Sequence, residues 1–352
     1  MFSNLPFSYM FVFTMMTGTL LSISSSHWLG IWAGLEINLI GFLPLLVYQK
    51  SMAESESAVK YFVVQALGSS LLMFGSLSCY TLSFSWDINV VSSYYIFTIF
   101  ALSCGLCVKM GLFPFHFWLP SVMAGLPWIS CLLLATWQKF APIFLMSSLL
   151  DVNLAHWMIL MISLMCAGSS LVGGVGGMNQ TQIRALLAYS SIGHLGWIVF
   201  SMLYGDWTMK VYLGIYVFIS ICIFVSLWYM DLSNMKSLVK FNQKKVLEMG
   251  IMLMLMSLGG LPPLLGFVSK WLVVSVSMST ALWGVLFLLI LGSLLSLFYY
   301  LSLFFSMFLS ETSKSFLLFK KNIKLMMLIN MIIIVNIAGG TLLVMSGALA
   351  SL

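Results

Sequence analysis

Long apolar runs follow one another along almost the whole chain, and they restrict the folds that are open to it. Most are 20 residues or longer, about the length of helix that crosses the hydrocarbon core of a bilayer. Only 7% of the 352 residues are charged and 61% are hydrophobic, whereas a soluble domain carries about 25% charged residues. We therefore expect an all-α polytopic membrane protein with about 11 transmembrane helices, forming a single membrane domain over residues 1–352. The expected spans are 5–25, 29–48, 58–84, 94–120, 126–150, 156–177, 183–204, 208–230, 246–279, 282–309 and 323–347.

Basic residues between the runs are concentrated on one side of the membrane. When the crossings are counted from the N-terminus, eleven basic residues fall on or near the N-terminal side, and the other side keeps only Lys210. By the positive-inside rule, the N-terminus faces the compartment of synthesis and the C-terminus the opposite compartment. The eleven residues are Lys50, Lys60, Arg184, Lys236, Lys240, Lys244, Lys245, Lys314, Lys320, Lys321 and Lys324.

Five ionisable side chains lie inside apolar runs. Glu36, Lys109, Lys139 and Lys270 are within the body of their runs, and Lys60 lies nearer one end. A charge at the bilayer centre costs about 2.5 to 3.5 kcal/mol on insertion scales, so several would cost on the order of 10 kcal/mol. We interpret them as a line of titratable groups that moves an ion, most simply a proton.

The run at 246–279 is too long for one straight helix and contains residues that break helices. Two glycines and two prolines interrupt it, and Lys270 follows about two turns later. Counting it as two crossings would move the lysines at 314–324 to the other side, so one interrupted crossing fits better. The breaking residues are Gly259, Gly260, Pro262 and Pro263.

The run at 94–120 has a similar arrangement, in which Lys109 is followed by Gly111, Pro114, His116 and Pro120. Broken helices at matching places in two halves, each with an ionisable residue, are typical of transporters built from inverted repeats. We expect the repeats at 29–150 and 156–309, with a C-terminal helix at 323–347. For a proline kink taken alone, simple packing is the alternative.

Six stretches in order along the chain resemble the antiporter-like membrane subunits of respiratory complex I. The count of about eleven spans is similar to the animal mitochondrial form of these subunits, which lacks the first three helices of the larger members. The last 70 or so residues carry no distinctive signature. The stretches are LGIWAGLEINLIGFLPL (29–45), ESAVKYFVVQALGSSLL (56–72), VKMGLFPFHFWLPSVMAGLPW (108–128), TWQKFAPI (136–143), GGMNQTQIRALLAYSSIGHLGW (176–197) and LGGLPPLLGFVSKW (258–271).

The resemblance implies a proton-translocating subunit and a role for each buried charge. It implies that Glu36 pairs with Lys109, that Lys139 is the central relay and that Lys270 belongs to the outer half-channel. Three further residues would lie along the same polar axis, namely Lys60, His116 and His194.

The resemblance also implies the cofactors, the partner subunits and the membrane. NADH, FMN, iron-sulfur clusters and ubiquinone would bind to partner subunits, with no cofactor in this chain. The partners would be other membrane-arm subunits, including neighbouring antiporter-like and accessory subunits, together with membrane lipids and no nucleic acid. The membrane would be the mitochondrial inner membrane, with the N-terminus on the matrix side and the C-terminus on the intermembrane-space side.

Two other functions stay open at this point. One is a free-standing cation/proton antiporter with the same fold, and the other is a passive scaffold whose lysines are structural. The individual residues have plainer alternatives too. Glu36 and Lys109 could form a static ion pair, Lys60 could neutralise Glu54 or Glu56, and an intramembrane histidine is often hydrogen-bonded packing.

Overall fold

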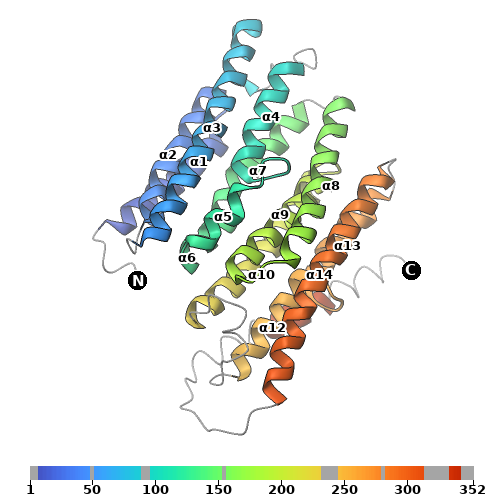
Figure 1. Ribbon diagram of the computed structural model, residues 1–352. Coiled ribbons are helices and arrows are strands. Elements are labelled where there is room, and N and C mark those ends of the chain that lie inside the picture. The colour runs from blue at the N-terminus through green and yellow to red at the C-terminus, as the bar shows by residue number, and fades with distance from the viewer. Residues whose placement is uncertain are drawn as a thin grey trace. The chain divides into compact units, whose positions relative to one another are not determined.

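The computed structural model describes residues 7–47, 51–88, 96–152, 156–230, 245–278, 282–312 and 333–341. These residues are almost entirely helical, and they contain no β-strand beyond one isolated bridge between His27 and Asp87 (Figure 1). Seven of the described helical segments, with Trp128–Val152 taken as one segment, are long and apolar enough to cross a membrane. The prediction of an all-helical polytopic membrane protein is confirmed. The expected span at 323–347 lies mostly outside the described residues, which include a helical segment at 333–341.

The chain divides into two compact units, Met1–Ser169 and Ser170–Leu352, and the boundary falls inside α8. The first unit holds α1 (Ser8–Ser24), α2 (Trp28–Leu46), α3 (Met52–Ser83), α4 (Ile96–Met110), α5 (Trp118–Gly125), α6 (Trp128–Ala135), α7 (Trp137–Val152) and the start of α8 (His156–Met178). The second holds the end of α8, α9 (Ile183–Met202), α10 (Asp206–Met230), α12 (Lys245–Gly259), α13 (Leu265–Ser277) and α14 (Trp283–Thr312).

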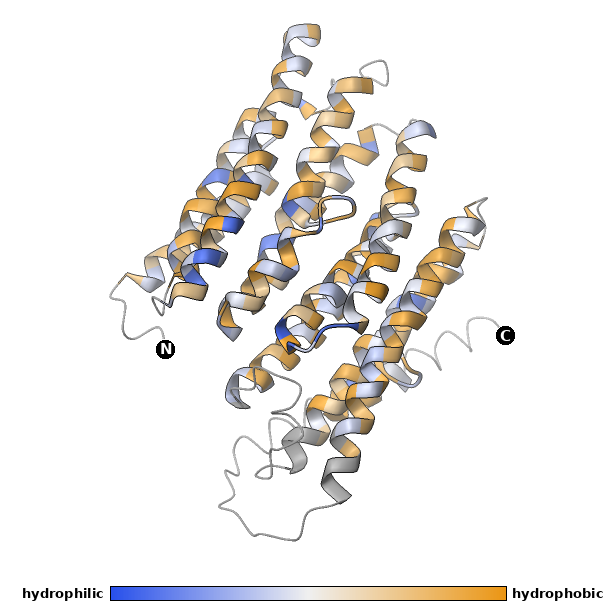
Figure 2. Cartoon of the chain, in the orientation of Figure 1, coloured by the Kyte–Doolittle hydropathy of each residue, from blue (hydrophilic) through white to orange (hydrophobic). Residues whose placement is uncertain are grey.

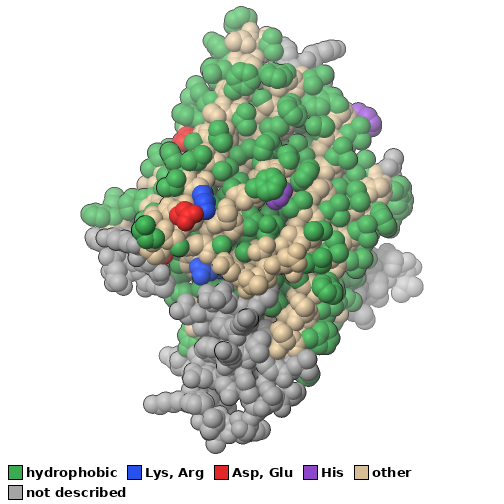
Figure 3. All heavy atoms as spheres, viewed as in Figure 1, with side chains coloured by type: hydrophobic (Ala, Val, Ile, Leu, Met, Phe, Trp, Pro, Cys, Tyr) green, Lys and Arg blue, Asp and Glu red, His purple; other side chains and the backbone are tan. Residues whose placement is uncertain are grey.

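Hydrophobic residues occur along every described helix, and the most hydrophilic residues fall in short stretches (Figure 2). In the space-filling view, hydrophobic side chains cover most of the described surface and charged ones are few (Figure 3). Large side chains such as Phe13 and Phe298 are exposed over 68% and 63% of their area. Such a surface is suited to lipid and to partner subunits rather than to water.

The helix ends agree with the expected spans to within a few residues, except at the start of α3. This helix begins at Met52 rather than near residue 58, because Ser51 caps it. The Ser51 hydroxyl accepts a hydrogen bond from the Glu54 backbone N–H at 3.2 Å. Serine followed three residues later by glutamate is the capping-box pattern, so the polar lead-in joins the helix.

Helices α1 and α2 pack with their backbones in close approach. A Cβ atom on Gly34 would lie 2.6 Å from the Ser22 nitrogen and 2.8 Å from the Gly18 carbonyl oxygen. Small residues of this kind let membrane helices associate. The contact fixes the position of α2, which carries Glu36.

The predicted break in 94–120 lies between α4 and α5. Gly111 follows the last residue of α4 with φ +76°, a left-handed conformation that glycine adopts without strain. Its N–H donates to the Cys107 carbonyl at 2.9 Å, and the Leu112 N–H donates to the same oxygen at 3.1 Å. A cis peptide bond joins Phe113 to Pro114. Pro120 is not part of the break, because it lies in the first turn of α5, where its missing N–H has no helical partner.

The predicted break in 246–279 lies between α12 and α13 and is built in the same way. Gly260 has φ +83°, and its N–H donates to the Met256 carbonyl at 3.1 Å. The Leu261 N–H donates to the same carbonyl at 3.3 Å, and a cis bond joins Pro262 to Pro263. Both breaks therefore begin with a glycine helix cap.

A third interruption, at Thr136 between α6 and α7, was not predicted. Thr136 departs from helical geometry with φ −114° and ψ −72°, and its hydroxyl donates to the Leu132 carbonyl at 2.7 Å. Lys139 lies one turn later, and its N–H donates to the Thr136 carbonyl at 3.2 Å. No glycine or proline lies at this position, so the sequence gives no sign that the helix is interrupted here.

Candidate functional site

Glu36 of α2 and Lys109 of α4 face each other in the first unit, as expected. The Glu36 Oε1 atom lies 3.9 Å from the Lys109 Nζ atom, and the side chains are 26% and 3% exposed. At this distance opposite charges attract, but the gap is too long for a hydrogen bond. The Glu36 Oε1 atom is buried and accepts no hydrogen bond from the described residues. The pair is therefore loose, and it can separate without breaking a direct hydrogen bond.

Lys109 stands in the last turn of α4, where helix carbonyls have no helical donors. Neighbouring helices supply some of the missing donors. The Trp118 indole of α5 donates to the Val108 carbonyl at 3.1 Å, and the Gln65 amide of α3 approaches the Lys109 carbonyl at 3.5 Å. The end of α4 is thus held from both sides, and a cation there is favoured by the helix dipole.

Lys109 and Lys139 line the same buried cavity. Its volume is about 10 Å³, which is room for about one water molecule. The Lys139 side chain projects from α7 and the residue is 3% exposed. The cavity thus brings together two lysines that lie 30 positions apart in the chain. Its other polar lining residues are Asn38, Tyr61, Gln65 and Gln138.

Asn38 and Gln138 form a reciprocal amide pair across this cavity that the sequence reasoning missed. The Asn38 Nδ2 atom donates to the Gln138 Oε1 atom at 2.7 Å, and the Gln138 Nε2 atom donates back to the Asn38 Oδ1 atom at 3.1 Å. Both residues are buried. A signal was present, because each is an uncharged amide inside an apolar run, within two residues of Glu36 or next to Lys139.

Lys270 of α13 reaches back across the break in the second unit. Its ammonium donates to the Gly259 carbonyl at 2.9 Å. It also lines a second cavity of about 10 Å³ together with His194 of α9. The His194 Nδ1 atom lies 3.0 Å from the Tyr212 hydroxyl, and His194 is buried. The structure therefore brings these two predicted residues together.

His116 lies in the break between α4 and α5. Its Nδ1 atom is 3.2 Å from the Pro114 carbonyl oxygen, and its ring centre is 4.0 Å from that of Phe117. It is buried, but it is not among the residues that line the cavity of Lys109 and Lys139. The structure places His116 at a helix break, and its role in proton transfer stays a prediction.

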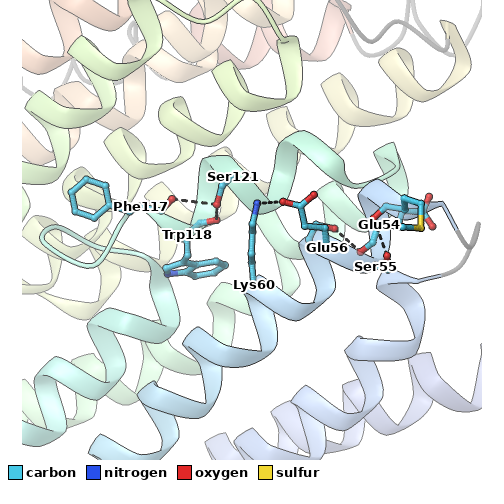
Figure 4. Close-up of polar contacts among 9 residues, drawn as sticks. Glu54, Ser55, Glu56, Lys60, Phe117, Trp118 and Ser121 are labelled. Atoms are coloured by element: carbon cyan, nitrogen blue, oxygen red, sulfur yellow. Dashed lines mark hydrogen bonds and ion pairs between the residues drawn. The ribbon is translucent and has the colours of Figure 1, made fainter.

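Lys60 lies apart from the buried charges. Its Nζ atom is 2.6 Å from the Glu56 Oε1 atom one turn earlier on α3, and the two side chains are 46% and 69% exposed (Figure 4). The geometry matches the alternative in which Lys60 neutralises a neighbouring glutamate. Exposed pairs of this kind contribute little stability.

No group of three or more His, Cys, Asp or Glu side chains is placed to hold a metal ion within the described ranges.

Comparisons with known proteins identify the family of the chain. Residues 25–299 match the family model described as NADH:quinone oxidoreductase/Mrp antiporter, TM. The chain is 37% identical over 295 residues to NADH-ubiquinone oxidoreductase chain 2 of Lumbricus terrestris, covering 83% of this chain and 84% of that protein. It is 39% identical over 328 residues to the chain of that name from Anopheles gambiae, covering 91% and 90%.

A solved structure has the same fold. A chain of respiratory complex I from Thermus thermophilus with bound Aureothin superposes with a TM-score of 0.83 at 26% identity, covering 95% of this chain and 78% of that one. The breaks, the buried lysines and these similarities agree with one another. The chain belongs to the family of NADH-ubiquinone oxidoreductase chain 2, antiporter-like membrane subunits of respiratory complex I.

Proposed function

We propose that this chain translocates protons along Glu36, Lys109 and Lys139 in its first unit and along His194 and Lys270 in its second. The observation that carries the proposal is the cavity shared by Lys109 and Lys139, with Glu36 at 3.9 Å from Lys109. Buried ionisable groups in a membrane domain are costly, so those that are present typically mark an ion pathway. His116 and Lys60 are assigned to the same axis by the sequence alone.

The proposed step begins at the loose ion pair. At an effective dielectric constant near 20, two unit charges about 4 Å apart attract with about 4 kcal/mol. If Glu36 is neutralised or moves away, Lys109 loses most of that attraction and releases its proton more readily. Lys139 lines the same cavity, and its amine, when neutral, would accept the proton. A charge change beside Glu36 would thus become a proton displacement deeper in the membrane.

The driving reaction would take place in other chains. In this proposal NADH, FMN, iron-sulfur clusters and ubiquinone bind to partner subunits, and the relatives' name, NADH-ubiquinone oxidoreductase, supports NADH and ubiquinone as the reactants. The proposed neighbours are antiporter-like and accessory subunits together with lipids. The proposed location is the mitochondrial inner membrane, with the N-terminus on the matrix side. Within the chain, we propose two inverted repeats at 29–150 and 156–309. The side bias of the basic residues supports this orientation, although eight of the eleven lie outside the described residues.

Replacing Lys109 by methionine in the assembled complex tests the proposal. Methionine has a side chain of similar length and fills the site without a titratable amine, so assembly should survive, whereas proton pumping and coupled electron transfer should fall. Lys109→Arg should not restore pumping, because a guanidinium does not release its proton. The matched control is Lys210→Met, since that ammonium is 54% exposed and pairs with Asp206 at 3.4 Å. If the Lys109→Met complex pumps the normal number of protons per electron transferred, the proposal is wrong and the passive scaffold is the better explanation.

A further inference from the structure

We propose that Asn38 and Gln138 are positioning residues that hold the hydrogen-bonded path between Lys109 and Lys139. This inference rests on the proposed proton function and adds two uncharged residues to it. Neither residue touches a cofactor or carries a proton as a charged group. Their role would be to orient the groups that do.

The two residues share a cavity with the two lysines and lie close to charged residues in the chain. Gln138 immediately precedes Lys139 on α7, and Asn38 follows Glu36 by two residues on α2. Both line the cavity that also receives Lys109 and Lys139. The amide pair therefore joins the helix of the carboxylate to the helix of the second lysine.

The hydrogen-bonding capacity of the pair is only partly used. Each primary amide has two N–H donors and an oxygen with two lone pairs. The reciprocal bonds take one donor and one lone pair from each side chain, and the Tyr61 hydroxyl approaches the Gln138 Oε1 atom at 3.5 Å. Among the described residues, no further bond is made by the other N–H of each amide or by the second lone pair of the Asn38 oxygen.

These leftover groups suit a proton path. Either spare N–H can donate to the oxygen of a water molecule, and the Asn38 oxygen can accept from an ammonium or from a water. The cavity has room for about one water molecule. An amide does not ionise at ordinary pH, so the pair can align donor and acceptor without trapping the proton itself.

The orientation of the Gln138 amide is fixed from several directions. Asn38 holds it from α2 and Tyr61 approaches it from α3. The Tyr61 ring is itself wedged edge-on between Phe42 and Trp118, with ring centres 5.3 Å and 5.8 Å away. A side chain locked in this way is suited to setting geometry, because its rotamer is not free to change.

The test compares three variants of the assembled complex in native membranes. Gln138→Met removes both hydrogen-bonding groups at similar volume, and Gln138→Asn keeps an amide but retracts it by one carbon. The matched control is Ser147→Ala on the same helix, since Ser147 is buried, bonds only locally to the Phe144 carbonyl and does not line the cavity. The measurements are complex assembly, proton pumping rate and the solvent isotope effect of pumping in D₂O.

We expect both Gln138 variants to slow pumping by roughly tenfold or more, because a misplacement of about 1 Å can cost about a hundredfold in rate. The isotope effect should rise in both, since proton transfer becomes rate-limiting, and Ser147→Ala should change neither quantity. A purely structural amide pair would lower assembly without changing the isotope effect, and that result would overturn the inference. If Gln138→Met does not assemble, an assembled Gln138→Asn complex with normal pumping overturns it as well.

Lys139→Met separates this inference from the proposed function. If that variant pumps poorly while Gln138→Met and Gln138→Asn pump normally, the lysine path stands and the positioning role of the amides is wrong. If Lys139→Met pumps at the normal rate, the proposed lysine path fails, and the inference falls with it.

Discussion

The ammonium of Lys270 and the carbonyl oxygen of Gly259 lie 2.9 Å apart, joined by a hydrogen bond that spans the break between α12 and α13. The carbonyl belongs to the last residue of α12, where the helix dipole favours a positive charge. A side chain that can lose its charge therefore links the two halves of a broken helix. Its charged form is the one that the helix end stabilises more strongly.

Lys270→Met should loosen this break as well as reduce pumping. The variant loses the bond to the Gly259 carbonyl, so backbone amides at 258–266 should exchange hydrogen faster. Lys270→Arg should keep those amides protected yet pump poorly, because its guanidinium stays charged. Ser275→Ala is the control, since this exposed hydroxyl on α13 bonds only to the nearby Leu272 carbonyl. Unchanged exchange in Lys270→Met would show that the hydrogen bond does not hold the break.

Gly260→Ala should destabilise the second unit. A Cβ atom at φ +83° is strained, at a cost of about 1 to 3 kcal/mol. It would also lie 3.0 Å from the Lys270 Nζ atom. The thermal midpoint of the assembled complex should fall. Gly284→Ala in α14 should not lower it, because a Cβ atom there meets no atom of the described residues within 4 Å. Equal midpoints for the two variants would contradict this account of the break.

Asn336→Leu should fray the start of α13. The Asn336 Oδ1 atom accepts from the Leu265 N–H at 3.2 Å, and Asn336 is 1% exposed. Loss of a cap of this kind costs about 0.5 to 2 kcal/mol. Faster hydrogen exchange at residues 265–267 would report the loss. Thr341→Val is the control in the same segment, because within the described part of the chain that exposed hydroxyl bonds to the Ala338 carbonyl alone. A protected α13 in Asn336→Leu would mean that another group caps it.

Single cysteines should report the proposed orientation. Asp206→Cys lies at the start of α10, on the proposed intermembrane-space side, and Thr181→Cys lies between α8 and α9 on the proposed matrix side. The native cysteines in the described residues are buried, so background labelling should be low. An impermeant thiol reagent added to mitochondria with a ruptured outer membrane should label Asp206→Cys alone. Labelling of Thr181→Cys alone would reverse the orientation.

The helices and the two main breaks could be predicted because their signals are local. Apolar length marks a span, and a glycine followed by prolines marks a break whatever the rest of the chain does. The pairing of Glu36 with Lys109 was given by family resemblance, and the structure brings the two side chains to 3.9 Å. Lys60 was assigned to the same axis, with neutralisation of Glu54 or Glu56 as the alternative, and in the structure it pairs with Glu56.

The missed features depend on contacts between distant parts of the chain. Asn38 and Gln138 are 100 positions apart, and their pairing depends on the rotation of α2 and α7 about their axes. A membrane helix carries apolar residues on all sides, so the hydrophobic pattern does not show which side of α2 or α7 faces the other helix. Asn336 reaches the start of α13 from 71 positions away, in a region with no distinctive sequence. The interruption at Thr136 has no glycine or proline to reveal it.

The two glycine-capped breaks have a consequence for how the halves of this chain should be compared. Lys109 precedes its cap, Gly111, by two residues, whereas Lys270 follows its cap, Gly260, by ten. Yet Lys109 stands in the last turn of α4 and the Lys270 ammonium folds back onto the last carbonyl of α12. The positive charge therefore occupies the same kind of place in both halves, although the residue that supplies it sits on opposite sides of the cap. An internal alignment anchored on the lysines would put the halves twelve residues out of register, so the glycines are the landmarks to superpose.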